Sequence, residues 1–168
     1  MILTGAQIRE EVKQGAIIID PFRPEQLNPN SYNYRLGDAL RVAADGQPGF
    51  RVLPIPADGY VLQKGAFALA NTFERIGSSR YAASLIGRSS IGRLGLFVQV
   101  SANLGHVNSI HRWTLELFAA HSVRIYAGLA IGQVSFWTSS GEIPFQKERY
   151  SAFDDPRPSL ARPDESAS

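Results

Sequence analysis

The sequence contains no cysteine among its 168 residues. The chain therefore has no disulfides, no thiolate metal ligands and no cysteine nucleophile. Lysine is also scarce, because only three of the 17 basic residues are lysines and the others are arginines. An arginine guanidinium binds phosphate or carboxylate through two parallel hydrogen bonds. This composition favours a few specific anion contacts.

Net charge and long apolar runs are lacking as well. The formal charge of +2 at pH 7 is too small for nonspecific coating of DNA or RNA, so we expect no nucleic-acid partner. No segment approaches the roughly 20 apolar residues of a membrane-spanning helix. Residues 1–15 do not have the pattern of a signal peptide. We expect a soluble, cytoplasmic protein with no membrane partner.

The hydrophobic content of 44% is enough for one folded domain with a buried core. We assign this domain to residues 1–150. Residues 151–168 are rich in Ser, Ala, Pro and Asp, so we expect a C-terminal tail that becomes ordered only where it docks, for example over an active site.

One helix and many short strands are predicted. Thr4 and Gln7 form a T-x-x-Q capping box, and Gly15 is a helix stop, so a short N-terminal helix is expected over residues 4–14. From residue 31 onward, apolar and polar residues alternate with the period of a half-buried strand. Strands are expected at residues 17–19, 32–36, 39–42, 50–53, 60–62, 66–72, 81–85, 96–102, 113–120 and 129–137. The predicted class is all-β, closed or sandwiched, with this one helix.

A Gly-Arg-Ser-Ser segment follows one of the predicted strands. Gly87 would allow close approach of the backbone, and Arg88 supplies charge. Ser89 and Ser90 supply hydroxyl and N–H groups at the start of a single helical turn. One interpretation is an anion pocket suited to phosphate. The other, favoured by the spacing alone, is an ordinary helix N-cap with a surface arginine.

Glu116 is the only acid in residues 94–130. It lies in a predicted core strand, where alternation places it on one face with Thr114 and Phe118. A carboxylate inside a strand is costly to bury unless it is paired, and Arg93 is one candidate partner. Such an acid is either half of a structural ion pair or a general base. The composition does not choose between these two interpretations.

Several motifs follow one another along most of the chain. The most specific are GRSSIGRLGL at residues 87–96, VQVSA at 98–102 and LEL at 115–117; the others are PNSYNYRLG at 29–37, AG-x-x-IGQ at 127–133, RY at 149–150 and P-x-PS at 156–159. Together they resemble the motifs of the dCTP deaminases, which belong to the trimeric dUTPase superfamily.

This resemblance implies a distorted β-barrel of jelly-roll type, assembled as a homotrimer with active sites between subunits. The implied reaction is hydrolysis of the 4-amino group of dCTP, which gives dUTP and ammonia without zinc. The absence of cysteine agrees, because zinc deaminases bind their metal through cysteine and histidine. Mg²⁺ would be carried in by the nucleotide triphosphate, and no residue is assigned as a metal ligand.

The resemblance also assigns roles to residues. Glu116 takes the position of the general base, which accepts a proton from the attacking water. Ser89 and the carbonyl of Ala102 would orient that water, and Arg93 would pair with Glu116. The expected substrate contacts are Arg88, Ser89, Ser90, Val100, Asn103, Arg149 and Tyr150.

The motifs that read the substrate depart from the family pattern. Asn33 stands where the family has Asp, and Phe153 stands where it has Gln. The third family motif, I-D-P-G-W-x-G, aligns with residues 105–111, where His106 replaces the acid and His111 the last glycine. The residues expected to catalyse the reaction are all present, whereas much of the part expected to recognise the substrate has changed. Recognition of a different sugar or base is therefore an alternative.

The leading hypothesis from the sequence is therefore a zinc-independent deaminase of a cytosine nucleotide. One alternative is a dUTPase-type nucleotide diphosphatase, which ranks lower because His106 stands where its water-activating acid belongs. Another is a homologue that binds a nucleotide without catalysis.

Overall fold

The computed structural model describes residues 1–43, 49–99 and 102–143. The predicted tail, together with Val100, Arg149, Tyr150 and Phe153, lies outside the described residues. The boundary between domain and tail stays a prediction.

The secondary structure is dominated by short strands. The strands are β1 (Ile17–Asp20), β2 (Tyr32–Arg35), β3 (Ala39–Ala43), β4 (Phe50–Pro54), β5 (Tyr60–Leu62), β6 (Phe67–Asn71), β7 (Arg75–Ser78), β8 (Ala82–Gly87), β9 (Leu96–Val98), β10 (Leu104–Gly105), β11 (Ile110–His111), β12 (Thr114–Ala119), β13 (Val123–Ile125) and β14 (Ala130–Trp137). The described helical segments are α1 (Gly5–Lys13), the 3-10 turn η1 (Pro24–Gln26) and the single turn α2 (Ser89–Gly92). None of them is long and apolar enough to cross a membrane.

Helix α1 begins where the sequence predicts. Thr4 Oγ1 accepts a hydrogen bond from the Gln7 N–H at 3.2 Å, as expected of an N-cap residue. The reciprocal hydrogen bond of the capping box, from the Thr4 N–H to Gln7 Oε1, is not found among the described residues. The Gln7 side chain instead lies toward Glu11, and its Nε2 donates to Glu11 Oε1 at 2.8 Å. Gly15 follows the helix with φ +74°, a conformation that glycine adopts without strain.

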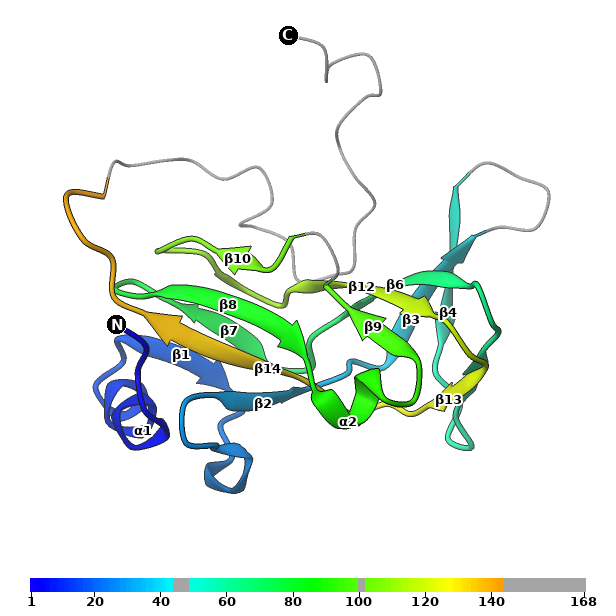
Figure 1. Cartoon of the computed structure of the whole chain (residues 1–168), viewed down its shortest axis with the longest axis horizontal. Coiled ribbons are helices and arrows are strands. Elements are labelled where there is room, and N and C mark those ends of the chain that lie inside the picture. Colours follow the sequence, from blue (N-terminus) through cyan, green and yellow to red (C-terminus); the bar gives the residue numbers. More distant parts are fainter. Residues whose placement is uncertain (44–48, 100–101, 144–168) are drawn as a thin grey trace, which may run out of the picture.

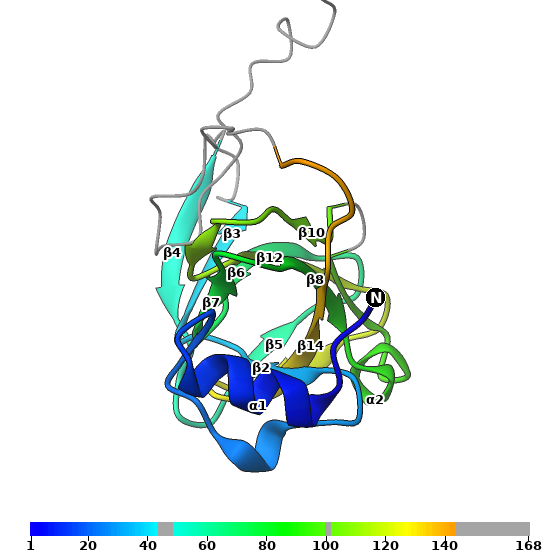
Figure 2. The ribbon, with the colours of Figure 1, turned by 90° about the vertical axis from the view of Figure 1, so that its left-hand side faces the viewer.

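The described strands form four antiparallel sheets, ordered β1-β7-β11, β10-β8-β14-β2, β4-β3-β6-β12-β9 and β13-β5 (Figure 1). Figure 2 shows the sheets wrapped around one interior, with α1 along one side. Buried side chains, among them Tyr32, Tyr34, Leu115 and Phe136, fill that interior. The mainly β class with one short N-terminal helix is confirmed, and the barrel-like enclosure is built from separate sheets around a common core.

Strand β12 carries Glu116 between β6 and β9 in the five-stranded sheet. Leu115 and Leu117 are fully buried on its inner face. Burial of each leucine contributes about 1.5–3 kcal/mol. Glu116 is half-buried and Phe118 exposed on the other face, as the alternation predicts. The packing of the inner face therefore fixes the carboxylate on the outer one.

Each predicted strand is present, with ends that shift by a few residues. The sequence analysis missed β7, β10, β11 and β13, which have two to four residues each and form by pairing with strands distant in the sequence. It also extended β9 too far, since the strand ends at Val98.

Candidate active site

The Gly-Arg-Ser-Ser segment joins β8 to α2. Arg88 is the N-cap residue with extended backbone, and its Nη1 donates to the Ala130 carbonyl at 3.2 Å. Its side chain is half-buried, whereas Ser89 and Ser90 are exposed. Within this chain, the atoms nearest to a Cβ added at Gly87 belong to Val98, the first at an ordinary 3.4 Å, so the expected close approach to a phosphate stays a prediction. The segment thus presents one oriented guanidinium and two exposed hydroxyls.

A second group of predicted residues gathers around Gln99. The Glu116 N–H donates to Gln99 Oε1 at 2.8 Å, and the Gln99 N–H donates to the Glu116 carbonyl at 3.1 Å. Gln99 Nε2 donates to the Ala102 carbonyl at 3.0 Å. The backbone of Glu116, the predicted base, is therefore linked through the Gln99 side chain to the Ala102 carbonyl, which is predicted to orient water. The sequence analysis did not single out Gln99.

These two groups lie at opposite ends of β9. Ser89 and Arg93 precede the strand, whereas Gln99, bonded to Glu116, follows it. Arg93 is exposed and, within the described chain, makes no ion pair with Glu116. The described part of one chain therefore does not bring Arg93 to Glu116, because the three-residue strand β9 lies between Arg93 and Gln99, to which Glu116 is bonded.

Asn103 lies just beyond the Ala102 carbonyl. It is exposed, and its Nδ2 donates to Ser84 Oγ at 3.4 Å. The Leu85 N–H donates to the Asn103 carbonyl at 2.8 Å, so the backbone at this position is fixed against β8.

The segment that replaces the third family motif forms β10, a turn and β11. Asn108 lies in that turn with φ +74°, a left-handed conformation that asparagine tolerates, and it aligns with the first glycine of the motif. His111 is 7% exposed, packs on Trp113 with ring centroids 4.3 Å apart and has Nδ1 3.0 Å from the Arg112 carbonyl. His106 is exposed. Of these two imidazoles, only His106 is free to meet a ligand.

Asn33, the position where the family has Asp, is part of an amide network. It pairs with Gln133 across β2 and β14. Its Oδ1 accepts from Asn28 Nδ2 at 2.9 Å, and Ser31 Oγ donates to Gln133 Oε1 at 3.0 Å. The network fixes the segment before β2 to β14 with neutral groups.

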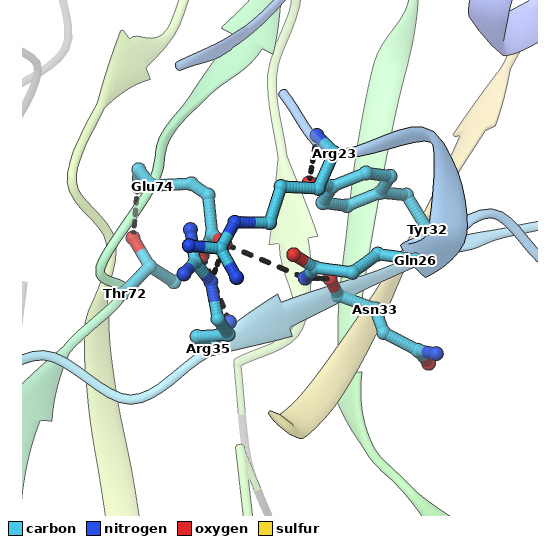
Figure 3. Close-up of polar contacts among 7 residues, drawn as sticks. All are labelled: Arg23, Gln26, Tyr32, Asn33, Arg35, Thr72 and Glu74. Carbon is cyan, nitrogen blue, oxygen red and sulfur yellow. Dashed lines mark hydrogen bonds and ion pairs between the residues drawn. The ribbon is translucent and has the colours of Figure 1, made fainter. Parts of the chain in front are cut away.

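Strand β2 also carries Arg35, one partner of a buried ion pair that the sequence analysis missed (Figure 3). Arg35 Nε lies 2.6 Å from Glu74 Oε1, and the Arg35 N–H donates to Glu74 Oε2 at 2.8 Å. Glu74 is fully buried, and the Arg35 guanidinium also stacks on Phe73 at 4.3 Å. Gln26 links Glu74 to β2, because its Nε2 lies 3.5 Å from Glu74 Oε1 and also donates to the Asn33 carbonyl.

The pKa values of two buried tyrosines of β2 are raised. Burial raises the pKa of Tyr32 to about 12, and the hydrogen bond that its hydroxyl accepts from the Arg23 N–H, at 3.0 Å, opposes this shift in part. Burial also raises the pKa of Tyr34, whose hydroxyl donates to the Ile86 carbonyl at 3.2 Å. Both hydroxyls are therefore neutral near pH 7 and serve as structural hydrogen-bonding groups.

Comparison with known proteins identifies the family. Residues 2–139 match the dCTP deaminase-like domain. The chain is 41% identical over 167 residues to a dCTP deaminase of Rhodopirellula baltica, with 95% of this chain and 84% of the relative covered. It is 40% identical over 148 residues to a dUMP-forming dCTP deaminase of Cytophaga hutchinsonii, with 84% and 85% covered.

The fold is also found in a solved structure. The 2′-deoxycytidine 5′-triphosphate deaminase from Agrobacterium tumefaciens has a TM-score of 0.68 and 21% sequence identity to this chain. The match covers 82% of this chain and 48% of that one, so the chain spans about half the length of that structure. The domain match and the two sequence relatives show that this chain belongs to the dCTP deaminase-like family.

Proposed function

We propose that the chain hydrolyses the 4-amino group of dCTP to give dUTP and ammonia without zinc. The observation that carries this proposal is the placement of Glu116, a half-buried residue on a well-packed strand, whose backbone is joined through Gln99 to the Ala102 carbonyl. A general base and a hydrogen-bond acceptor for water are the two groups that hydrolytic deamination needs. The relatives named dCTP deaminase support the same chemistry.

In the proposed mechanism Glu116 accepts a proton from water as the water oxygen bonds to C4 of the cytosine. The protonated Glu116 gives this proton to N3. It then takes the proton of the new C4 hydroxyl and passes it to the amino group, so that the C4–N bond breaks, the C4 carbonyl forms and ammonia leaves. Ala102, through its carbonyl, and Ser89, through its hydroxyl, orient the water. The uracil product keeps the water oxygen at C4.

The proposed assembly is a homotrimer with shared active sites. Its support is the separation of the two groups in one chain, where Ser89 and Arg93 precede β9 and Glu116 is bonded beyond its other end. In a closed ring, Arg93 of one subunit would pair with Glu116 of the next. Light scattering should give a mass of about three times 18.4 kDa. A monomer at micromolar concentration would contradict the shared site.

Arg88, Ser89 and Ser90 would bind the triphosphate, with further substrate contacts from Val100, Asn103, Arg149 and Tyr150. Mg²⁺ would arrive on the nucleotide and be bound mainly through phosphate and water. Among the described residues, no group of three or more His, Asp or Glu side chains is placed to hold a metal ion.

A second candidate is formation of dUMP, in which deamination is followed by hydrolysis that releases pyrophosphate. The names of several relatives favour it, because those from Cytophaga hutchinsonii, Clostridium acetobutylicum and Leptospira biflexa are all called dUMP-forming. This second step needs an activated water at the α-phosphate, and His106 stands where the family motif has its acid. We therefore rank dUTP as the product.

The test is to incubate the protein with dCTP, CTP, dCMP and dUTP in the presence of Mg²⁺ and to measure ammonia and pyrophosphate separately. Ammonia from dCTP without pyrophosphate is the expected result. Ammonia with equal pyrophosphate would establish the dUMP-forming reaction, and pyrophosphate from dUTP alone would establish a diphosphatase. Absence of both products would contradict an enzymatic function on these nucleotides.

A further inference from the structure

Gln99 holds a backbone conformation that is uncommon for a residue with a side chain. Its φ is +55°, in the left-handed region, directly after β9. In this conformation it makes the hydrogen bonds described above: two with the backbone of Glu116 and one with the carbonyl of Ala102. Strained backbone of this kind persists where surrounding contacts fix it, often beside functional groups.

The side-chain amide of Gln99 forms hydrogen bonds with two different segments of the chain. Its oxygen accepts from β12, and its nitrogen donates to the Ala102 carbonyl. A carbonyl oxygen has two lone pairs, so Ala102 retains one to accept a hydrogen bond from water. The donated hydrogen bond fixes the direction of that second lone pair relative to Glu116.

We propose that Gln99 is a positioning residue for the deamination, which sets the separation between the Glu116 base and the Ala102 carbonyl. This inference rests on the proposed function of the site. Gln99 acts through these two groups rather than on the substrate. A misplacement of about 1 Å between reacting groups costs up to about 100-fold in rate. Loss of the link therefore lowers kcat, while the groups that bind the triphosphate are unaffected.

The deciding variant is Gln99→Glu. It keeps the size of the side chain and an oxygen that accepts from the Glu116 N–H, but it replaces the amide donor with an oxygen that repels the Ala102 carbonyl. We expect kcat for dCTP to fall about 10- to 100-fold, with KM and Tm close to those of the wild type. The matched control is Gln63→Glu, because Gln63 is exposed and its Oε1 accepts only a surface hydrogen bond from Ser122 Oγ, at 3.2 Å.

A wild-type kcat in folded Gln99→Glu overturns the proposal, and so does a loss that arises from KM alone. If Gln99→Glu does not fold, Gln99→Met decides by the same criteria, since it removes both side-chain hydrogen bonds without adding charge. A wild-type protein that releases no ammonia from dCTP contradicts the proposed function, and with it the role of Gln99. A normal wild type beside a fully active Gln99→Glu contradicts the role of Gln99 alone.

Discussion

The buried pair of Arg35 and Glu74 makes the folded state sensitive to the loss of one negative charge. In Glu74→Gln, the side chain keeps its size and one acceptor oxygen, but Arg35 retains its charge at a site that is only 8% exposed. Removing one partner of a buried ion pair costs about 3–5 kcal/mol, because the other charge is left without compensation. A domain of this size has a total stability of about 5–15 kcal/mol. We therefore expect Tm to fall by about 6–20 °C.

The measurement is urea unfolding followed by tryptophan fluorescence, with the m-value compared between variants. Glu10→Gln is the matched control, because its pair with Lys13 is exposed on both sides and is worth less than about 1 kcal/mol. In the double variant Arg35→Met/Glu74→Gln the stranded charge is gone, while the amide still accepts from the backbone N–H of residue 35. We expect it to recover most of the lost stability. If Glu74→Gln lies within about 1 kcal/mol of the wild type at unchanged m-value, the reasoning about Arg35 is refuted.

Two further predictions concern phosphate binding and alkaline stability. Arg88→Ala should raise KM for dCTP about 10- to 100-fold, because a charge-assisted contact contributes about 1.5–3 kcal/mol. The matched control is Arg124→Ala, which also removes an arginine bonded to a backbone carbonyl and should leave KM unchanged. Equal KM values for the two variants would show that Arg88 does not bind phosphate. Burial raises the pKa of Tyr32 from 10.0 to about 12, so the unfolded state loses this proton first and stability falls as pH rises from about 10 to 12. Tyr32→Phe should make this decline shallower in denaturation curves measured at pH 9–12, and an unchanged slope would contradict the assignment.

The local elements of the fold were predictable from short sequence patterns. Thr4 and Gly15 mark the two ends of α1, and alternation identifies β12 with its buried leucines. These signals arise within a few residues of each other, where propensity and burial of one face agree.

The contacts that organise the site were not predictable in the same way. Arg35 and Glu74 are separated by 39 residues, and the alternation around Arg35 assigns it to the solvent face. Arg35 is buried because it pairs with Glu74, and no pattern in the sequence around Arg35 reveals this distant partner. The link through Gln99 was missed for a similar reason, because it depends on a left-handed backbone and on a strand 17 residues away.

The central claim is that Glu116 is the base for deamination of dCTP, and release of ammonia by the wild type and Glu116→Gln tests it most directly. The variant keeps the shape of the side chain and its hydrogen-bonding capacity but cannot accept the proton from water. We expect ammonia from the wild type and a rate about 10²–10⁴-fold lower in the variant, with Tm and nucleotide binding retained. The exposed Glu10→Gln should retain the wild-type rate. A Glu116→Gln protein that releases ammonia from dCTP at the wild-type rate would contradict the mechanism.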